Sequence, residues 1–194
     1  MRSNWRQIFS EDILIPRRIE QRQEDRLKSI YRILQQKKIE GDLDLEDVPI
    51  TSLGNLEYIS GDLNLHNTLI TSLGNLVRIE GDLNLGDTPV ISLGNLKSVF
   101  GEAQMYYTRL TSLGNLEYVG ETLDVSNSPI ASLGNLRRVG DYLNLSYTSV
   151  TNFGNLKYVG GDLFLKETPI ARMSERQRKK MRENIDIRGG IYYE

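Results

Sequence analysis

The chain has 194 residues, 39% hydrophobic and 26% charged, with a net charge of −2. This length suits one domain with a sizeable core, and the composition is that of an ordinary globular protein. The chain has no cysteine and one histidine, which excludes disulfides, thiol nucleophiles and metal sites made of several histidines. No apolar run could span a bilayer and the N-terminal residues lack the apolar stretch of a signal peptide, so we expect a cytoplasmic protein with no membrane partner.

Residues 1–38 are predicted to form an N-terminal segment and a capping helix. Pro16 is followed by apolar side chains at helical spacing, which indicates an amphipathic helix over residues 17–38 that covers the first repeat. These apolar residues are Ile19, Leu27, Ile30, Tyr31 and Leu34. Residues 1–16 are too few to fold alone, so we expect them to pack on the end of the repeats or to serve in docking or self-association, including a homodimer through an end cap.

Residues 39–170 consist of an uninterrupted 20-residue repeat, for example GDLNLHNTLITSLGNLVRIE from Gly61. The alternation Leu63-Asn64-Leu65 predicts a short strand with its leucines inward, and a second corner follows at Ser72–Asn75. One such unit cannot bury its own leucines, but stacked units can. We therefore predict a mainly β, right-handed solenoid of seven to eight parallel rungs with a helix at each end.

The motif Leu63-x-Leu65-x-x-Thr68-x-Ile70 resembles the LxLxxNxL core of leucine-rich repeats, with threonine in place of the usual asparagine. The four-residue step from Ile59 to Leu63 and the VxGDL-like approach to the strand are similar to the receptor L-domain variant of that family. Short repeats of this kind also occur in bacterial and phage proteins. The resemblance covers residues 39–170 and implies a protein-binding repeat.

Residues 171–194 are predicted to form a C-terminal cap. The segment Ile187–Tyr193 matches Ile59–Leu65, but it follows an eight-residue insertion that replaces one corner. Ser174 and Gln177 have the spacing of a capping box, which predicts a short basic helix to about Asn184, followed by a final strand.

Stacked carboxylates are the first candidate for chemistry. Asp42, Asp62, Asp82 and Glu102 recur at one position of successive repeats. They could bind a cation, act as acid and base, or attract a basic partner. We interpret them as acceptors for strand-entry amides that also keep the parallel sheet soluble. No metal, cofactor or catalytic residue is expected, and the chain is predicted not to be an enzyme; a carbohydrate-active β-helix enzyme stays as an alternative.

Exposed aromatic residues are the second candidate. The fourth repeat breaks the consensus, and later repeats carry further aromatic residues on the same predicted face; together they form a candidate partner-binding site of Tyr106, Tyr107, Arg109, Tyr142, Tyr147 and Phe164. Tyrosine and arginine are enriched in binding hot spots, although outward tyrosines can also simply cover a sheet. We therefore predict a non-catalytic protein-protein interaction module, such as a phage or bacterial factor that binds or inhibits a host protein.

Nucleic acid is the alternative partner. Basic residues gather in the first 40 residues and in the last 24, whereas residues 41–170 are acidic. The basic ends could contact phosphates, and the acidic repeats could instead mimic DNA. Charge runs are more often solvated faces, so a protein partner is preferred.

Overall fold

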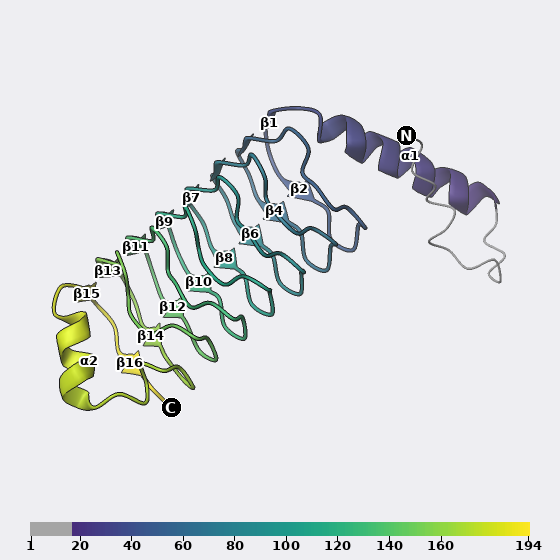
Figure 1. Ribbon diagram of the computed structural model, residues 1–194. Helices are drawn as coiled ribbons and strands as arrows, with labels where there is room; N and C mark the ends of the chain where they lie inside the picture. The colour runs from purple at the N-terminus through teal and green to yellow at the C-terminus, as the bar shows by residue number, and fades with distance from the viewer. Residues whose placement is uncertain (1–16) are drawn as a thin grey trace.

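A computed structural model describes the backbone of residues 17–194 and the side chains from residue 24 onward, so the expectations for residues 1–16 and for the Ile19 side chain fall outside the described residues. Two parallel sheets of eight strands each run the length of the molecule (Figure 1). Sheet A contains β1 (Lys38–Ile39), β3 (Tyr58–Ile59), β5 (Arg78–Ile79), β7 (Ser98–Val99), β9 (Tyr118–Val119), β11 (Arg138–Val139), β13 (Tyr158–Val159) and β15 (Asp186–Ile187). Sheet B contains β2 (Leu43–Asp44), β4 (Leu63–Asn64), β6 (Leu83–Asn84), β8 (Ala103–Gln104), β10 (Leu123–Asp124), β12 (Leu143–Asn144), β14 (Leu163–Phe164) and β16 (Ile191–Tyr192).

The strands stack in the register of the sequence repeat. Leu43 pairs with Leu63, and each following sheet B strand to Leu163 pairs with the one 20 positions on. The predicted parallel solenoid with a helix at each end is therefore confirmed. It makes about 6 turns, slightly fewer than the seven to eight rungs expected. The last step is longer, since Asp162 and Gly190 are bonded across 28 positions, and the extra eight residues are the predicted insertion.

The core is a set of inward columns that repeat in every turn. In the second turn the side chains of Leu65, Ile70, Leu73, Leu76 and Ile79 have no exposed area. Each such burial contributes about 1.5–3 kcal/mol relative to an exposed side chain. The threonine of the motif is also buried, and its hydroxyl donates to a carbonyl three residues earlier, as Thr68 does to Leu65 at 2.8 Å. Threonine thus closes the turn without leaving a buried donor unpaired.

A third side of the solenoid joins the two sheets and has no named strands. We define it as residues 48–56, 68–76, 88–96, 108–116, 128–136 and 148–156. Proline occupies its second position in alternate turns, at Pro49, Pro89 and Pro129, and proline has no N–H to donate. In two of the turns between, the backbone N of Arg109 donates to the Val90 carbonyl (3.1 Å) and that of Ser149 to the Ile130 carbonyl (2.8 Å). From the third turn onward, hydrogen bonding at this position therefore repeats every two turns.

The corner at the end of the third side shows the same two-turn alternation. The backbone N of Asn95 donates to the Gly74 carbonyl at 3.0 Å. Between the next two turns the side chain takes over, and Asn115 Nδ2 donates to the Gly94 carbonyl at 3.1 Å. The asparagine that recurs at this corner therefore serves the turn backbone.

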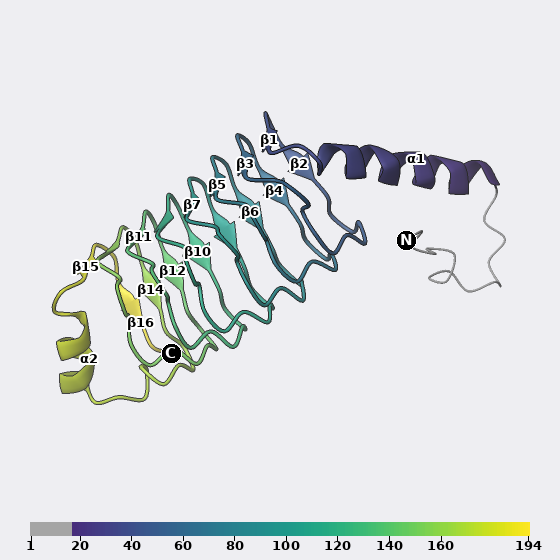
Figure 2. The same cartoon turned by 45° about the horizontal axis from the view of Figure 1, so that its top comes forward.

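The helix α1 (Arg17–Ile33) projects away from the first turn, as Figures 1 and 2 show. Only its end caps the core: Ile30 and Leu34 are buried, and the Leu34 carbonyl accepts from Asn55 N at 3.0 Å, as Gly74 does from Asn95. Tyr31 is 62% exposed, so its prediction as part of the packed stripe is wrong. Tyr31 follows the buried Ile30 by one residue, about 100° round the helix, so its side chain points away from the core.

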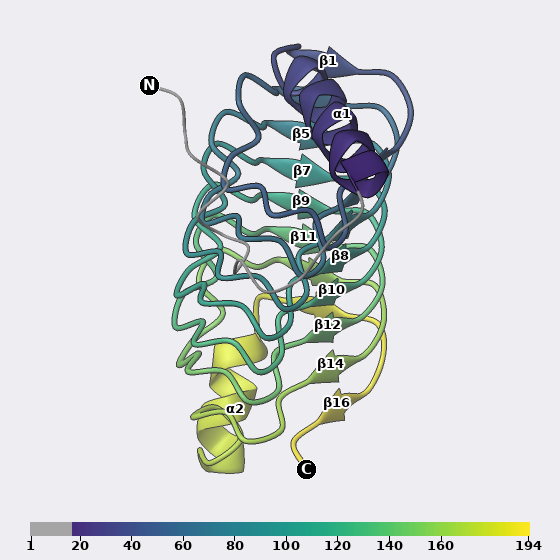
Figure 3. The same cartoon turned by 90° about the vertical axis from the view of Figure 1, so that its right-hand side faces the viewer.

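The helix α2 (Glu175–Arg182) confirms the predicted basic helix, although it ends two residues earlier than expected. Gln177 Oε1 accepts from Ser174 N at 3.0 Å, and the expected capping box between these two residues is present. Arg182 donates to the Tyr193 hydroxyl at 2.8 Å, and the Arg178 guanidinium lies 4.0 Å from the centre of the Tyr193 ring. Figure 3 shows α2 beside the last turns, at the opposite end of the stack from α1. Neither helix of the described chain is long and apolar enough to cross a membrane.

Candidate protein-binding surface

The carboxylate column of sheet B holds neighbouring turns together. Asp42 Oδ1 accepts from Asp62 N (2.9 Å), Asp62 Oδ1 from Asp82 N (2.8 Å), and Asp82 Oδ1 from Glu102 N (2.7 Å). This is the arrangement expected if the acids serve the amides at the start of the next strand. Within residues 17–194 no group of three or more histidine, cysteine or acidic residues could hold a metal ion.

The outward aspartate or asparagine at the centre of five sheet B strands is also used by its own turn. Asn64 Oδ1 accepts from His66 N at 3.1 Å, and Asp124 Oδ1 accepts from Ser126 N at 2.8 Å. Such side-chain-to-backbone bonds stabilise the turn that follows the strand. The polar part of sheet B is therefore explained largely by the construction of the solenoid.

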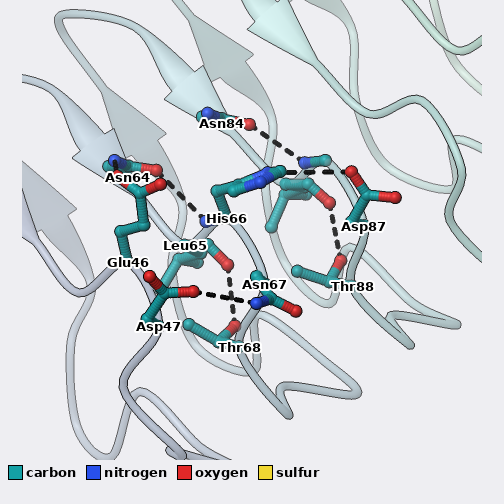
Figure 4. A network of polar contacts seen from close by, with 12 residues as sticks. Glu46, Asp47, Asn64, Leu65, His66, Asn67, Thr68, Asn84, Asp87 and Thr88 are labelled. Carbon is teal, nitrogen blue, oxygen red and sulfur yellow. Dashed lines mark hydrogen bonds and ion pairs between the residues drawn. The ribbon is translucent and has the colours of Figure 1, made fainter.

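The corner after each sheet B strand requires a left-handed backbone. Figure 4 shows this corner in the first three turns, where its residues are Asp47, Asn67 and Asp87, with φ between 54° and 59°. Asparagine and aspartate tolerate this conformation better than other residues with a Cβ. The corner side chains also bond to one another, since Asn67 Nδ2 donates to Asp47 Oδ1 at 2.8 Å. The first turns thus carry a favourable and mutually paired polar corner.

Tyrosine occupies the same corner in the fourth and sixth turns. Tyr107 has φ 53° and Tyr147 has φ 58°, and they are 59% and 48% exposed. We call these two residues the rim pair. For an ordinary L-residue this backbone region costs about 1–2 kcal/mol. Within the described chain neither hydroxyl makes a hydrogen bond or ion pair. The rim pair therefore bears a backbone penalty that internal polar contacts do not offset.

Tyr106 has a different role from Tyr107, although the sequence predicts both as binding residues. Its ring lies over Gly86 of the previous turn, where an added Cβ would come within 2.7 Å of the ring carbon Cζ. Gly86 is buried beneath it, and Tyr106 itself is half-buried. The two rings meet edge to face with centroids 6.0 Å apart. Tyr106 thus supports the position of Tyr107 and covers the sheet.

The remaining predicted site residues lie apart from the rim pair. Tyr142 packs edge to face on Phe164, with centroids 6.0 Å apart, and Phe164 stacks on Tyr192 at 5.1 Å. This aromatic cluster lies at the β16 end of sheet B. Arg109 is exposed on the third side, two residues after Tyr107. No contact joins the cluster to the rim pair within the described chain, so the predicted single face divides into two regions.

Sheet A carries an aromatic and cationic ladder that the sequence analysis did not single out. Arg78 lies over the Phe100 ring at 4.1 Å, and Arg138 over the Tyr158 ring at 3.8 Å. Phe100 and Tyr118 have ring centroids 5.2 Å apart. The signal was present in the alternation of cations and tyrosines at one repeat position. Because each ring is covered by a neighbouring turn, the ladder stabilises the stack of turns.

One ion pair on sheet A alters the pKa of its members. The Arg78 guanidinium donates to the Glu80 carboxylate at 2.7 Å and lowers the pKa of Glu80 below its ordinary value. Burial and a hydrogen bond to Glu80 raise the pKa of Tyr58. The shift of Glu80 follows mainly from a contact within one turn, and that of Tyr58 partly from a contact between turns on sheet A.

Comparison with known proteins adds no family to this description: no protein-family model matches the chain, and no curated protein matches its sequence. The class is defined by the structure itself, a parallel-strand solenoid of about 6 turns with repeats of about 20 residues.

Proposed function

We propose that this chain is a non-catalytic protein-binding module and that the rim pair is the centre of its binding surface. The observation that carries the proposal is the pair of exposed tyrosines at left-handed backbone positions. Residues held in such conformations persist where function compensates for them. The same corner is occupied by asparagine or aspartate in four other turns, which shows that the fold does not require tyrosine there.

The chemistry of the surrounding residues fits a protein partner. Tyrosine offers a large contact area with little loss of side-chain entropy, and Arg109 supplies a charged, hydrogen-bonding group beside Tyr107. Arg109, like the rim pair, replaces the residue usual at its repeat position. Tyr142 and Phe164 would extend the contact towards β16 if the partner is large enough to follow sheet B.

We further propose that the solenoid is a leucine-rich-repeat variant of the receptor L-domain type that acts in the cytoplasm, in the manner of bacterial or phage factors that bind or inhibit a host protein. The strand-and-turn motif supports this, because the buried threonine bonds the turn carbonyl from the position that asparagine takes in the LxLxxNxL core. The carboxylate column favours neither a DNA mimic nor a glycosidase, because its Oδ1 atoms serve backbone amides.

The test is quantitative capture of partners from a lysate of the source cells by the tagged chain. The rim variant is Tyr107→Asn with Tyr147→Asn, which installs the residue that the corner already carries at Asn67 and Asn127. We expect this variant to stay folded and to lose the captured protein. A matched control replaces Lys179 and Lys180 of α2 by glutamate and should capture the protein as the wild type does.

The outcome that overturns the proposal is also specific. Suppose that the rim variant still captures the protein and the Lys179/Lys180 variant does not. If capture by the wild type also falls steeply with salt and is abolished by nuclease, the binding surface is α2 and the partner is a nucleic acid.

A further inference from the structure

The third side of the solenoid is almost free of charge. Its six segments contain one charged residue, Arg109, in a chain that is 26% charged overall. The charged residues of residues 41–170 otherwise lie on the outer faces of sheets A and B and on the corners beside them. The exclusion of charge is therefore specific to one side of the molecule.

Each segment of this side has inward side chains in the core, such as Ile70 and Leu73, and exposed ones between them. Leu69 is 53% exposed and Ile91 is 62% exposed, and they occupy adjacent turns. Ile91 N donates to the Thr71 carbonyl at 2.9 Å, which holds the two turns side by side there. Pro49 and Ala131 are exposed on the same side. An exposed patch of this kind, with charged residues depleted, is typical of the core of a protein interface.

The construction of the turns does not explain the missing charge. The serine, glycine and asparagine of the corner are needed for its hydrogen bonds, such as Gly74 N to Ser72 Oγ at 3.1 Å. The side chains at the positions of Leu69 and Ile91 are not needed for such hydrogen bonds. In other turns the first position holds Arg109, and the second holds Thr111 or Ala131. Lysine or glutamate would fit there, as they do on the outer face of sheet A.

We propose that the third side is the contact surface of a homodimer, in which the uncharged sides of two copies of this chain pack together. An isologous contact places one surface against itself, so a charged face meets its own charge. The carboxylates of sheet B would repel one another in such a contact, whereas the third side meets its copy with almost no like charge. Its prolines are rigid, so little conformational entropy is lost when they are covered.

The area sets the expected strength of the dimer. The stack has about six turns at a spacing of ~4.8 Å. In each turn about four to five positions, inward and outward, precede the corner and rise by ~3.3 Å each. The product is a flat area of roughly 450 Å² per copy. Even with the relief of the side chains this lies below the ~800 Å² per partner of a standard stable interface. We therefore expect a reversible dimer that forms at micromolar concentrations. This contact shares only Arg109 with the proposed partner surface and excludes the rim pair, so variants that leave Arg109 in place test the two surfaces separately.

Sedimentation velocity of the full chain between about 1 and 200 µM tests the proposal. The wild type should shift from monomer to dimer, and Leu69→Lys with Ile91→Lys should shift the dissociation constant upward by at least tenfold. The control Val77→Lys adds charge at a residue that is 37% exposed and lies beside sheet A, and it should dimerise as the wild type does. Circular dichroism melting confirms that each variant is folded.

Because the chain has no cysteine, a single thiol can report where the contact lies. With Ile91→Cys, reaction with a bulky maleimide should slow as protein concentration rises; with Val77→Cys it should not. A wild type that stays monomeric at 200 µM overturns the proposal, as does a dimer that the Leu69/Ile91 variant still forms. If both the wild type and the Leu69/Ile91 variant are monomeric, and only the wild type captures another protein, the third side binds a different partner and not a second copy.

Discussion

Replacing Tyr147 by alanine and by glycine measures the backbone penalty of the rim pair directly. Both substitutions remove the ring, so lost packing is the same in each and cancels in the comparison. At an ordinary surface position alanine is more stable than glycine by about 0.5–1 kcal/mol, because glycine loses more chain entropy on folding. At φ 58° the order should reverse, since only glycine adopts this conformation without a steric cost.

The size of the reversal follows from two opposing terms. The left-handed backbone costs alanine about 1–2 kcal/mol and costs glycine nothing. The greater entropy that glycine loses on folding reduces its advantage over alanine by about 0.5–1 kcal/mol. Tyr147→Gly should therefore be more stable than Tyr147→Ala by about 0.5–1 kcal/mol. In a chain of this size that corresponds to a difference in melting temperature of about 2–3 °C.

Urea denaturation of both variants, with the slope m held equal, is the assay. The control is the same pair of substitutions at Tyr142, which is 40% exposed and is not among the residues with positive φ. There alanine should be the more stable of the two. If alanine is also the more stable residue at position 147, the tyrosine carries no backbone penalty, and the main support for a binding role of the rim pair is lost.

Further predictions concern the stack of turns. Leu123→Asp buries an unpaired carboxylate and should lower the free energy of unfolding by several kcal/mol, whereas Asp124→Asn should cost about 1 kcal/mol, because one amide oxygen cannot accept from both Ser126 N and Asn144 Nδ2 as the carboxylate does; similar losses would contradict the inward and outward assignment. Gly140→Ala should cost more than about 3 kcal/mol by denaturation, since the new Cβ meets the Gly120 carbonyl oxygen, a backbone atom that cannot move aside. The pKa of Glu80 measured by NMR titration should lie below its ordinary value and rise in Arg78→Gln, because Arg78 is the main cause of the lowering. Because the folded-state pKa is lowered, the small stabilisation from this carboxylate is present above its unfolded pKa and is lost as the pH falls through the folded pKa. Calorimetric titration with calcium, magnesium or zinc should show no specific site tighter than about 10 µM.

The repeat made the fold predictable to the residue. Inward positions such as Leu63 and Ile79 recur every 20 residues, and a stack of identical turns has only one way to bury them all. The eight-residue insertion and the basic helix α2 were predictable for the same reason, because the final strand returns to the repeat pattern after it. Tyr31 was misassigned, because helical spacing shows which residues share a stripe but not where the helix leaves the core.

The candidate site was less predictable, because its details depend on contacts between turns. The sequence placed Tyr106 and Tyr107 together, but only the position of Gly86 beneath one ring separates a supporting residue from an exposed one. The left-handed corner had a signal, the asparagine and aspartate at positions 47, 67, 87 and 127. Tyr142 and Phe164 were placed on the same face as the rim pair, but within the described chain their rings contact each other and Tyr192, not Tyr107 or Tyr147.

The alternation of proline on the third side makes 40 residues, and not 20, the natural unit of length for this molecule. Deleting or adding a single turn would bring two proline turns, or two turns without proline, into contact. Backbone hydrogen bonds such as that from Arg109 N to the Val90 carbonyl would then lose their donor or their acceptor. Deleting or adding two turns would restore every neighbour to its present kind. Lengthening the solenoid by design, or shortening it by unequal exchange in the genome, should thus preserve the hydrogen bonding when turns are added or removed in pairs. A change by a single turn leaves one mismatched junction between neighbouring turns.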